Sequence, residues 1–218
     1  MTRKLFWDDP YRTTLDTTIT SVAGEDITVA ETILYAFAGG QERDHGTIAE
    51  RPVVHARKAG TAIVYTLANA RGLAPGDAVR MTIDWERRYA LMRLHFAAEL
   101  VLEVAYQTLG SIEKIGAHIA QDKARIDFAW PDNLAPLLPA IADTVHALVA
   151  ADRPITSAFS DPAAERRYWE LPGFARVACG GTHLRRTGEV GAIDLRRKNV
   201  GKGKERIEIY LRDQPGLS

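Results

Sequence analysis

A neutral chain of 218 residues, with 28 Lys and Arg against 28 Asp and Glu, is long enough to bury one large core or two small ones. Its 46% hydrophobic and 26% charged residues are those of an ordinary soluble globular protein, and no apolar run approaches the roughly 18–20 residues that span a bilayer. The start lacks a hydrophobic signal core, and a single cysteine excludes an internal disulfide, so we expect a cytoplasmic protein without a membrane partner.

The first eighty-odd residues have the pattern of short strands separated by turns. Ala23-Gly24-Glu25 and Lys58-Ala59-Gly60-Thr61 are each flanked by β-rich runs and predict two hairpins. Pro75-Gly76-Asp77 is a further turn signal. Closely spaced short strands favour a small β-barrel. The predicted strands are 17–22, 26–29, 32–37, 53–57, 62–67 and 79–85.

The pattern changes near residue 86. From Glu86 to Leu109 there is no Gly or Pro, and apolar residues recur at helical spacing, which predicts a largely buried helix. Strands followed by helices interleaved with strands indicate an α+β protein with a β-rich domain at 1–87 and a second domain at 88–218. The further predicted elements are strands at 124–128, 155–159, 192–198 and 206–211, a helix within 133–150, and a short helix around 161–167.

The only cysteine lies in the run Cys179-Gly180-Gly181-Thr182-His183. His95 and Glu99 lie one turn apart on the predicted helix, so they project from the same face. Zinc takes thiolate, imidazole and carboxylate ligands, commonly in short-spaced pairs. Spacing alone leaves two alternatives open. His95 could be a hydrogen-bonded core histidine, and Cys179 could be a small buried hydrophobic residue.

Several motifs in one order carry a resemblance that covers nearly the whole chain. A glycine-rich run at 32–41, the approach to the helix of His95 at 83–89, the Cys-Gly-Gly-Thr-His run and the closing Gly201-Lys202-Gly203 all take part. So does Leu5 to Tyr11, which looks like the family's first strand. Together they resemble the editing domain of alanyl-tRNA synthetase and the free-standing alanyl-tRNA editing proteins. The resemblance implies that residues 88–218 form a two-layer α/β editing domain with a mainly antiparallel sheet.

The resemblance also implies a function: hydrolysis, without ATP, of the ester between a wrong amino acid and tRNA. The expected cofactor is zinc, held by His95, Glu99, Cys179 and His183. The expected substrate is alanine-specific tRNA charged with serine, since an apolar pocket rejects an added hydroxyl only about 100-fold. Thr32 and Gln41 are expected to line the amino-acid pocket. The simpler alternative is that Thr32 is only a strand residue and Gln41 only a turn residue.

Two residues depart from the family pattern. Ala38 stands where its glycine-rich motif begins, and Glu99 stands where the helix carries a second histidine. Glu99 has three readings: a fourth ligand, a base beside a three-ligand site, or a sign that the metal is lost. The rival functions are an aminoacyl-tRNA binding module without catalysis and a zinc hydrolase of another small ester or amide.

The end of the chain is basic although the whole chain is neutral. From Leu184 onward nine Lys and Arg face five Asp and Glu, a balance of 9 − 5 = +4. Such a segment suits contact with tRNA phosphates, and the alternative is a solvated pair of surface strands. No obligate protein partner is evident from the sequence. The residues expected to bind tRNA are Arg185, Arg186, Lys202 and Lys204.

Overall fold

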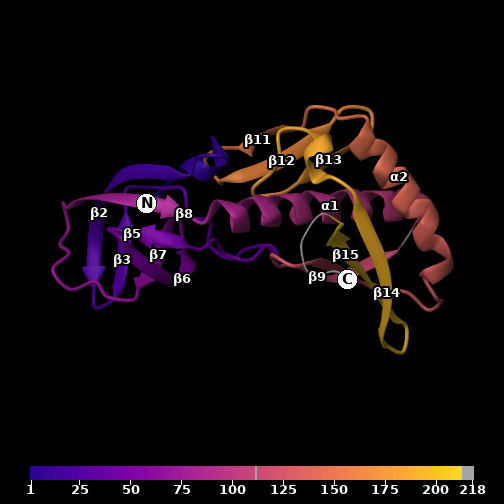
Figure 1. The fold of residues 1–218 in the computed structure, drawn as a ribbon, viewed down its shortest axis with the longest axis horizontal. Coiled ribbons are helices and arrows are strands. Elements are labelled where there is room, and N and C mark those ends of the chain that lie inside the picture. The colour runs from indigo at the N-terminus through magenta and orange to yellow at the C-terminus, as the bar shows by residue number, and fades with distance from the viewer. Residues whose placement is uncertain (111, 213–218) are drawn as a thin grey trace. The chain divides into compact units, whose positions relative to one another are not determined.

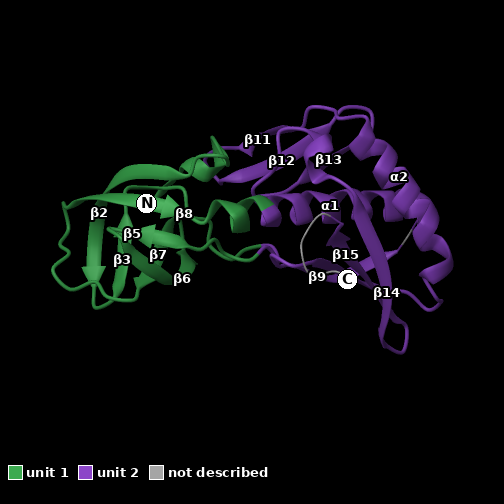
Figure 2. Cartoon of the chain, in the orientation of Figure 1, with its two compact units in different colours: residues 1–38, 42–89 green, residues 39–41, 90–218 purple. Residues whose placement is uncertain are grey.

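The computed structural model describes residues 1–110 and 112–212, which divide into two compact units (Figures 1 and 2). Unit 1 comprises residues 1–38 and 42–89; unit 2 comprises residues 39–41 and the described chain from residue 90. The chain is a mixed α+β protein with mostly antiparallel sheets, as predicted. The sequence-based boundary at 87/88 lies beside the division after Tyr89, but nothing in the sequence signalled that residues 39–41 belong to unit 2.

Unit 1 is built on a closed barrel whose strands follow the order β2-β3-β7-β6-β5-β8. Ile27, Ile63, Tyr65 and Met81 alternate with more exposed neighbours and are fully buried in its core. Every neighbouring pair in the barrel is antiparallel. The strands are β2 (Thr14–Ala23), β3 (Asp26–Val29), β5 (Gly46–Ile48), β6 (Arg51–Ala59), β7 (Ala62–Leu67) and β8 (Ala78–Ile83).

Two predicted strands of unit 1 are wrong in large part. Only β4 (Glu31–Thr32) of the run 32–37 is a strand, and it pairs in parallel with β1 (Arg3–Lys4). The following backbone N–H groups bond to side chains instead of a neighbouring strand: Leu34 to Thr32 Oγ1 at 3.0 Å and Tyr35 to Asp44 Oδ2 at 2.6 Å.

The segment that resembled a first strand contains a short 3-10 helix, η1 (Leu5–Trp7). Its three apolar side chains are all buried. An apolar run of this length fits a buried helical turn as well as a strand, and periodicity does not separate the two.

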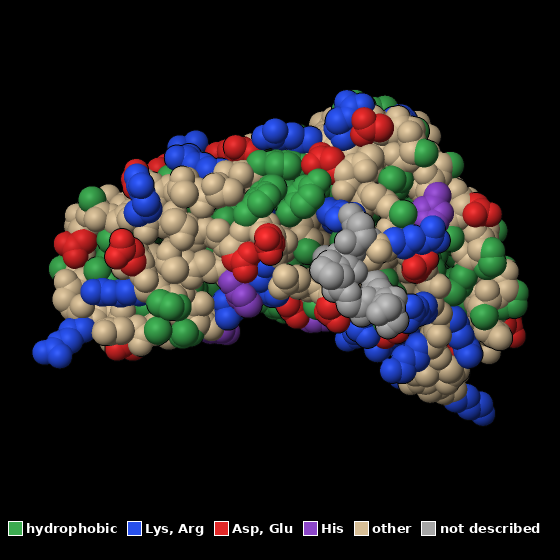
Figure 3. Space-filling view, viewed as in Figure 1, with side chains coloured by type: hydrophobic (Ala, Val, Ile, Leu, Met, Phe, Trp, Pro, Cys, Tyr) green, Lys and Arg blue, Asp and Glu red, His purple; other side chains and the backbone are tan. Residues whose placement is uncertain are grey.

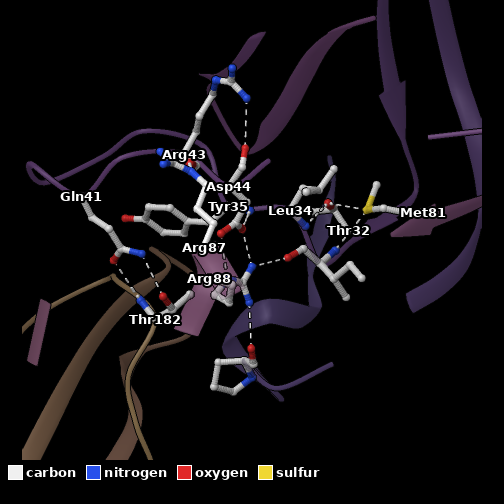
Figure 4. A network of polar contacts seen from close by, with 12 residues as sticks. Thr32, Leu34, Tyr35, Gln41, Arg43, Asp44, Met81, Arg87, Arg88 and Thr182 are labelled. Carbon is white, nitrogen blue, oxygen red and sulfur yellow. Dashed lines mark hydrogen bonds and ion pairs between the residues drawn. The ribbon is translucent and has the colours of Figure 1, made fainter. Parts of the chain in front are cut away.

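A buried ion pair joins the loop after β4 to the first turns of helix α1 (Trp85–Leu109). Arg88 is fully buried, and its Nε lies 2.8 Å from Asp44 Oδ1. Further guanidinium bonds go to the backbone carbonyls of Ile33 and Pro10 (Figure 4). A buried charge needs such partners, because an unpaired one costs several kcal/mol.

Unit 2 contains two antiparallel sheets. A four-stranded sheet has the order β14-β15-β10-β9, and a three-stranded sheet has the order β11-β12-β13. Their strands are β9 (Glu113–Ile119), β10 (Ala124–Ala129), β11 (Thr156–Asp161), β12 (Arg166–Leu171), β13 (Ala175–Ala178), β14 (Ile193–Gly201) and β15 (Lys204–Leu211). The sequence prediction missed β9, β12 and β13.

The short helix expected around 161–167 is wrong, because this segment turns between β11 and β12. The N–H of Ala164 bonds to the Asp161 side chain at 3.0 Å, and Glu165 has a φ of 52°. Asp commonly closes turns in this way, and a positive φ is incompatible with a continuing helix.

Helix α1 is the buried centre of unit 2 from residue 90 onward. The ring of Phe96 packs edge-on against that of Trp169 on β12, with 5.1 Å between the ring centroids. Leu102 and Ile126 of β10 line the same small cavity. The helix therefore contacts both sheets (Figure 1). The second helix, α2 (Leu138–Ala150), follows a 3-10 turn, η2 (Ala135–Leu137), and contacts β14. Within the described residues, no helix is long and apolar enough to cross a membrane.

Candidate functional site

Three elements of unit 2 bring His95, Cys179 and His183 together. His95 lies on α1, and both His95 and most of its neighbours on the helix are buried. Cys179 directly follows β13, and its backbone N–H bonds to the carbonyl of Arg167 at 2.9 Å, which continues the β12–β13 pairing. His183 lies in the loop beyond it. One potential ligand atom from each residue falls within 4.8 Å of the others, so the structure brings together three residues of the predicted metal set.

The separations between these donors fit a shared metal ion. His95 Nε2 lies 3.4 Å from Cys179 Sγ and 3.3 Å from Glu99 Oε1. Two protein donors at zinc-ligand distances from one tetrahedral ion stand about 3.3–3.6 Å apart. Glu99 therefore stands at donor spacing from His95, although the cluster with all atoms within 4.8 Å contains only the other three residues.

The imidazole of His183 has one nitrogen in use and one available. Its Nδ1 lies 3.0 Å from Ser157 Oγ on β11, whereas within the described chain its buried Nε2 has no hydrogen-bond partner. With the proton on Nδ1 donated to Ser157, Nε2 carries a free lone pair. Burial, together with the nearby His95, lowers the pKa of His183 well below its ordinary value. A neutral imidazole with an orphaned buried nitrogen is the form that binds a metal ion.

Glu99 is ionised at neutral pH in spite of its burial. Burial raises its pKa, but the hydrogen bond and charge of His95 outweigh that effect and set the pKa of Glu99 to about 2. In turn, burial lowers the pKa of His95, but Cys179 and Glu99 together raise it well above the ordinary value. The site thus combines an anionic carboxylate and a thiol with two imidazoles, which is a cation-binding donor set.

Gln41 supports the loop that carries His183. Its Nε2 donates to Thr182 Oγ1 at 2.9 Å, and its Oε1 accepts from the Thr182 N–H at 3.3 Å (Figure 4). The carbonyl of Thr182 in turn lies 3.2 Å from His95 Nδ1. Gln41 itself is held by a parallel bridge to Ile119 at the end of β9. The described contacts use the Gln41 amide to support the metal loop; its expected role in lining a pocket stays a prediction.

Two glycines permit this close packing. A Cβ on Gly181 would lie 2.1 Å from Cε1 of His95, so only glycine fits opposite the imidazole. A Cβ on Gly40, which has a φ of +88°, would lie 2.7 Å from the carbonyl oxygen of Ala117 on β9. By contrast, a Cβ on Gly180 would meet no described atom within 4 Å apart from its chain neighbours. In the Cys-Gly-Gly-Thr-His run, then, the second glycine is required by the approach of His95.

A small cavity of about 30 Å³ borders His95 and Glu99. Its walls are mainly apolar, with Ala98 and Leu102 from α1 and Ala117 from β9, and Lys114 also lines it. A space of this size holds about one water molecule or a group of similar size.

The roles expected for the other site residues, Thr32 among them, stay predictions. Thr32 is fully buried in unit 1, where its hydroxyl lies 2.6 Å from the Tyr65 hydroxyl. Lys202 and Lys204 are exposed where β14 turns into β15, and Lys and Arg side chains gather over this hairpin (Figure 3). Arg185 is exposed too.

Arg186 is exposed as well, but its Nε donates to Asp152 at 2.8 Å. The role of these four residues in binding tRNA stays a prediction. Sequence reasoning missed Ser157 and Thr182 as contacts of the two histidines. Neither stands at a diagnostic spacing: Ser157 precedes His183 by 26 residues on another strand.

Comparison with known proteins points to one family. Residues 172–208 match the threonyl and alanyl tRNA synthetase second additional domain. The chain is 31% identical to the alanyl-tRNA editing protein AlaX-M of Pyrococcus horikoshii over 97% of this chain and 98% of that protein. It is 29% identical to AlaX-M of Methanosarcina mazei, with 98% of each chain covered. It is also 32% identical to the alanine–tRNA ligase of Staphylothermus marinus, of which it spans 26%. The chain belongs to the alanyl-tRNA editing protein AlaX-M family.

Proposed function

We propose that this protein is an aminoacyl-tRNA deacylase that acts in trans on mischarged tRNA, with Ser-tRNA(Ala) as its substrate. Water adds its hydroxyl to the ester carbonyl carbon, the ester C–O bond breaks, and the proton goes to the departing ribose oxygen. The products are free serine and uncharged tRNA. An aminoacyl ester is already activated, so the protein has only to orient it and supply water.

The observation that carries the proposal is the convergence of His95, Cys179 and His183, with Glu99 beside them, in a chain similar throughout to an alanyl-tRNA editing protein. The orphaned Nε2 of His183 and the donor spacings of 3.3 and 3.4 Å support a zinc site. We assign His95, Cys179 and His183 as ligands and Glu99 as the fourth donor.

A bound zinc ion would supply Lewis acidity for the ester carbonyl or lower the pKa of a water to about 7, and either role requires a coordination position beyond the four donors, through five-coordination or withdrawal of Glu99. The chain's own residues hold the ligands in position. Ser157 fixes the ring of His183, and Gln41 holds the loop of Thr182, so the ligands are already in position. The cavity beside Glu99 has room for one small group, which supports a substrate with a side chain as small as that of serine.

Selection of serine over alanine has a physical basis in a polar site. A pocket that hydrogen-bonds the serine hydroxyl leaves buried groups unpaired when alanine is bound, which favours the seryl ester strongly. The exposed Lys202 and Lys204 would contact tRNA phosphates. A single cysteine that must remain a thiol suits the reducing cytoplasm, where we place the protein.

The proposal is tested by incubating the purified protein with Ser-tRNA(Ala), Gly-tRNA(Ala) and Ala-tRNA(Ala) and following release of each amino acid. Release of serine with Ala-tRNA(Ala) left intact supports the proposal. Tight tRNA binding without release of any amino acid would instead identify a binding module. Absence of release with zinc bound would contradict the proposal and favour a hydrolase of another ester or amide.

The metal is tested separately by elemental analysis of protein purified without added metal. We expect about one zinc ion per chain. A content near zero that added zinc does not restore would contradict the zinc assignment, whatever the deacylation assay shows.

A further inference from the structure

A second and larger cavity lies within unit 1. Its volume is about 380 Å³, within the ~300–1,000 Å³ range of small-ligand pockets. We call it the Arg43 pocket. It is formed by the loop after β4, by β6 and by the first turns of α1. Its polar and aromatic lining residues are Phe37, Glu42, Arg43, His45, His55 and Arg87.

The charge of the Arg43 pocket favours an anion. Arg87 is almost fully buried, donates from Nε to the backbone carbonyl of Arg43 at 3.2 Å, and pairs with Glu42 at 2.6 Å. Glu42 is the one carboxylate among the lining residues, beside the two guanidiniums of Arg43 and Arg87. Two guanidiniums and one carboxylate give a pocket charge of 2 − 1 = +1 with neutral histidines.

Arg43 is placed to bind a ligand. Its Nη1 donates to the backbone carbonyl of Asp44 at 3.0 Å (Figure 4). It also donates to the carbonyl of Val53 at 3.3 Å, and the two bonds fix the side chain. Within the described chain its Nε and Nη2 are left for a ligand. Burial, followed by repulsion from Arg87, lowers the pKa of Arg43, a sign that its charge lacks full compensation. Phosphate is the anion whose geometry a guanidinium matches in a bidentate way.

The histidines of the pocket add hydrogen-bonding groups rather than charge at neutral pH. Burial, with Arg87 and Arg43 nearby, lowers the pKa of His45. A neutral imidazole both donates and accepts, so it suits the polar edge of a base or a ribose hydroxyl.

An aromatic side chain completes the pocket. Phe37 lines it and is 55% exposed, although most large apolar side chains of unit 1 are buried. An exposed ring beside a cationic groove is the arrangement on which bases of single-stranded nucleic acid stack. The stacked base and its phosphate would then contact Phe37 and Arg43 from one ligand.

We propose that the Arg43 pocket binds a nucleotide, with its phosphate on Arg43 and its base on Phe37. This inference deepens the proposed function and rests on it for the source of the nucleotide, the single-stranded 3′ end of tRNA. The same chemistry would accept a free nucleotide, and the test separates the two sources.

The test measures binding of a short fluorescein-labelled single-stranded RNA ending in CCA to the full chain by fluorescence anisotropy at several salt concentrations. The RNA carries no amino acid, so binding is scored independently of hydrolysis. We expect Phe37→Ala to weaken binding roughly 5- to 150-fold. We expect Arg43→Gln to reduce the slope of log affinity against log salt by about 0.7, the loss of one phosphate contact.

Matched controls lie in the same unit outside the pocket. Val54→Ala removes another exposed apolar side chain, and Arg80→Gln removes an exposed arginine; both should bind as the wild type does. Circular dichroism checks that each variant is folded. If Arg43→Gln does not fold, Arg43→Lys replaces it, because it keeps the charge but not the guanidinium. The affinity of Phe37→Ala for the RNA then still tests the proposal.

The outcomes separate clearly. Displacement of the RNA by AMP at similar concentrations identifies a free nucleotide as the ligand, whereas RNA binding that AMP does not displace identifies the strand. Wild-type affinity and salt slope in both Phe37→Ala and Arg43→Gln would overturn the proposal, even if the protein deacylates tRNA. Loss of RNA binding in Phe37→Ala would support it even if no deacylation were found.

Discussion

The hydroxyl of Ser157 lies 3.0 Å from Nδ1 of His183, on the opposite side of the ring from the nitrogen that is left without a partner. Ser157 stands on β11 and His183 in the loop after β13, so the two meet only through the folding of the three-stranded sheet. With the proton of His183 on Nδ1, this contact leaves the buried Nε2 available to the cluster with Cys179 and His95. Residues that orient a metal ligand in this way are nearly as influential as the ligand itself.

Replacing Ser157 with alanine should therefore weaken zinc binding about 10- to 100-fold without unfolding the protein, because Nδ1 loses its acceptor. Competition with a chromogenic chelator measures the affinity. Ser160→Ala on the same strand is the matched control, since that exposed hydroxyl donates to the carbonyl of Arg166 and takes no part in the cluster of His95, Cys179 and His183. Equal affinity in Ser157→Ala and Ser160→Ala would remove Ser157 from the site.

Glu99 offers a sharper test of the donor set. If the carboxylate is the fourth donor, Glu99→Ala should lose both zinc affinity and serine release, and Glu99→His should retain zinc, because imidazole nitrogen and carboxylate oxygen bind at about the same distance. Zinc content and the release rate are measured on each variant. A Glu99→Ala protein with full zinc but no release would make Glu99 the base instead of a ligand.

Gln41 is expected to act through Thr182. Gln41→Ala leaves the buried N–H and hydroxyl of Thr182 without their present partner, which costs about 1–3 kcal/mol for an unsatisfied buried group. Urea unfolding and the release rate should both decline. Gln107→Ala, at an exposed glutamine, is the control. Unchanged stability with lost activity would favour the sequence-based prediction that Gln41 contacts the amino acid.

Parts of this architecture were predictable from sequence because local patterns determine them. The long helix from residue 85 to 109 follows from an uninterrupted apolar run, and the hairpins about Gly24 and Gly60 follow from their turn residues. The four metal-capable residues were identified from spacing and resemblance. Their approach to within a few ångströms depends on long-range packing, which spacing does not specify.

Other features were not predictable for the same reason. The run after Thr32 is apolar and β-rich, but its backbone bonds to Asp44 and Thr32 side chains and forms no long strand. Nothing local marks Arg88 as the one of two adjacent arginines that is fully buried with Asp44. Likewise, residues 39–41 join unit 2 through a bridge to Ile119, a contact across more than seventy residues.

The Asp44–Arg88 pair should be the most sensitive polar contact of unit 1. Asp44→Asn removes the negative charge and leaves the fully buried Arg88 without its counter-ion, which we expect to cost about 3–5 kcal/mol. Urea unfolding followed by circular dichroism measures the change. Asp16→Asn, at an exposed ion pair with Arg80, should have little effect. Comparable effects of the two substitutions would contradict a structural role for the buried pair.

Glu205 predicts a dependence of stability on pH. The hydrogen bond from Arg197 lowers the pKa of Glu205. Burial opposes this effect, and a hydrogen bond from Asn199 adds to it. Its contribution is therefore present above the unfolded-state pKa of about 4.3 and is lost as the pH falls through the lower folded value. The stability difference between wild type and Glu205→Gln should be large near neutral pH and shrink in acid. A difference that does not change with pH would contradict this assignment.

The most direct test of the central claim is the rate at which serine is released from Ser-tRNA(Ala) by the wild type and by Cys179→Ala at equal concentration. The account predicts rapid release by the wild type and release at the uncatalysed rate by Cys179→Ala, since the substitution removes the sulfur donor from the cluster with His95 and His183. Undiminished release by a folded Cys179→Ala protein would contradict the claim that this cluster is the catalytic centre.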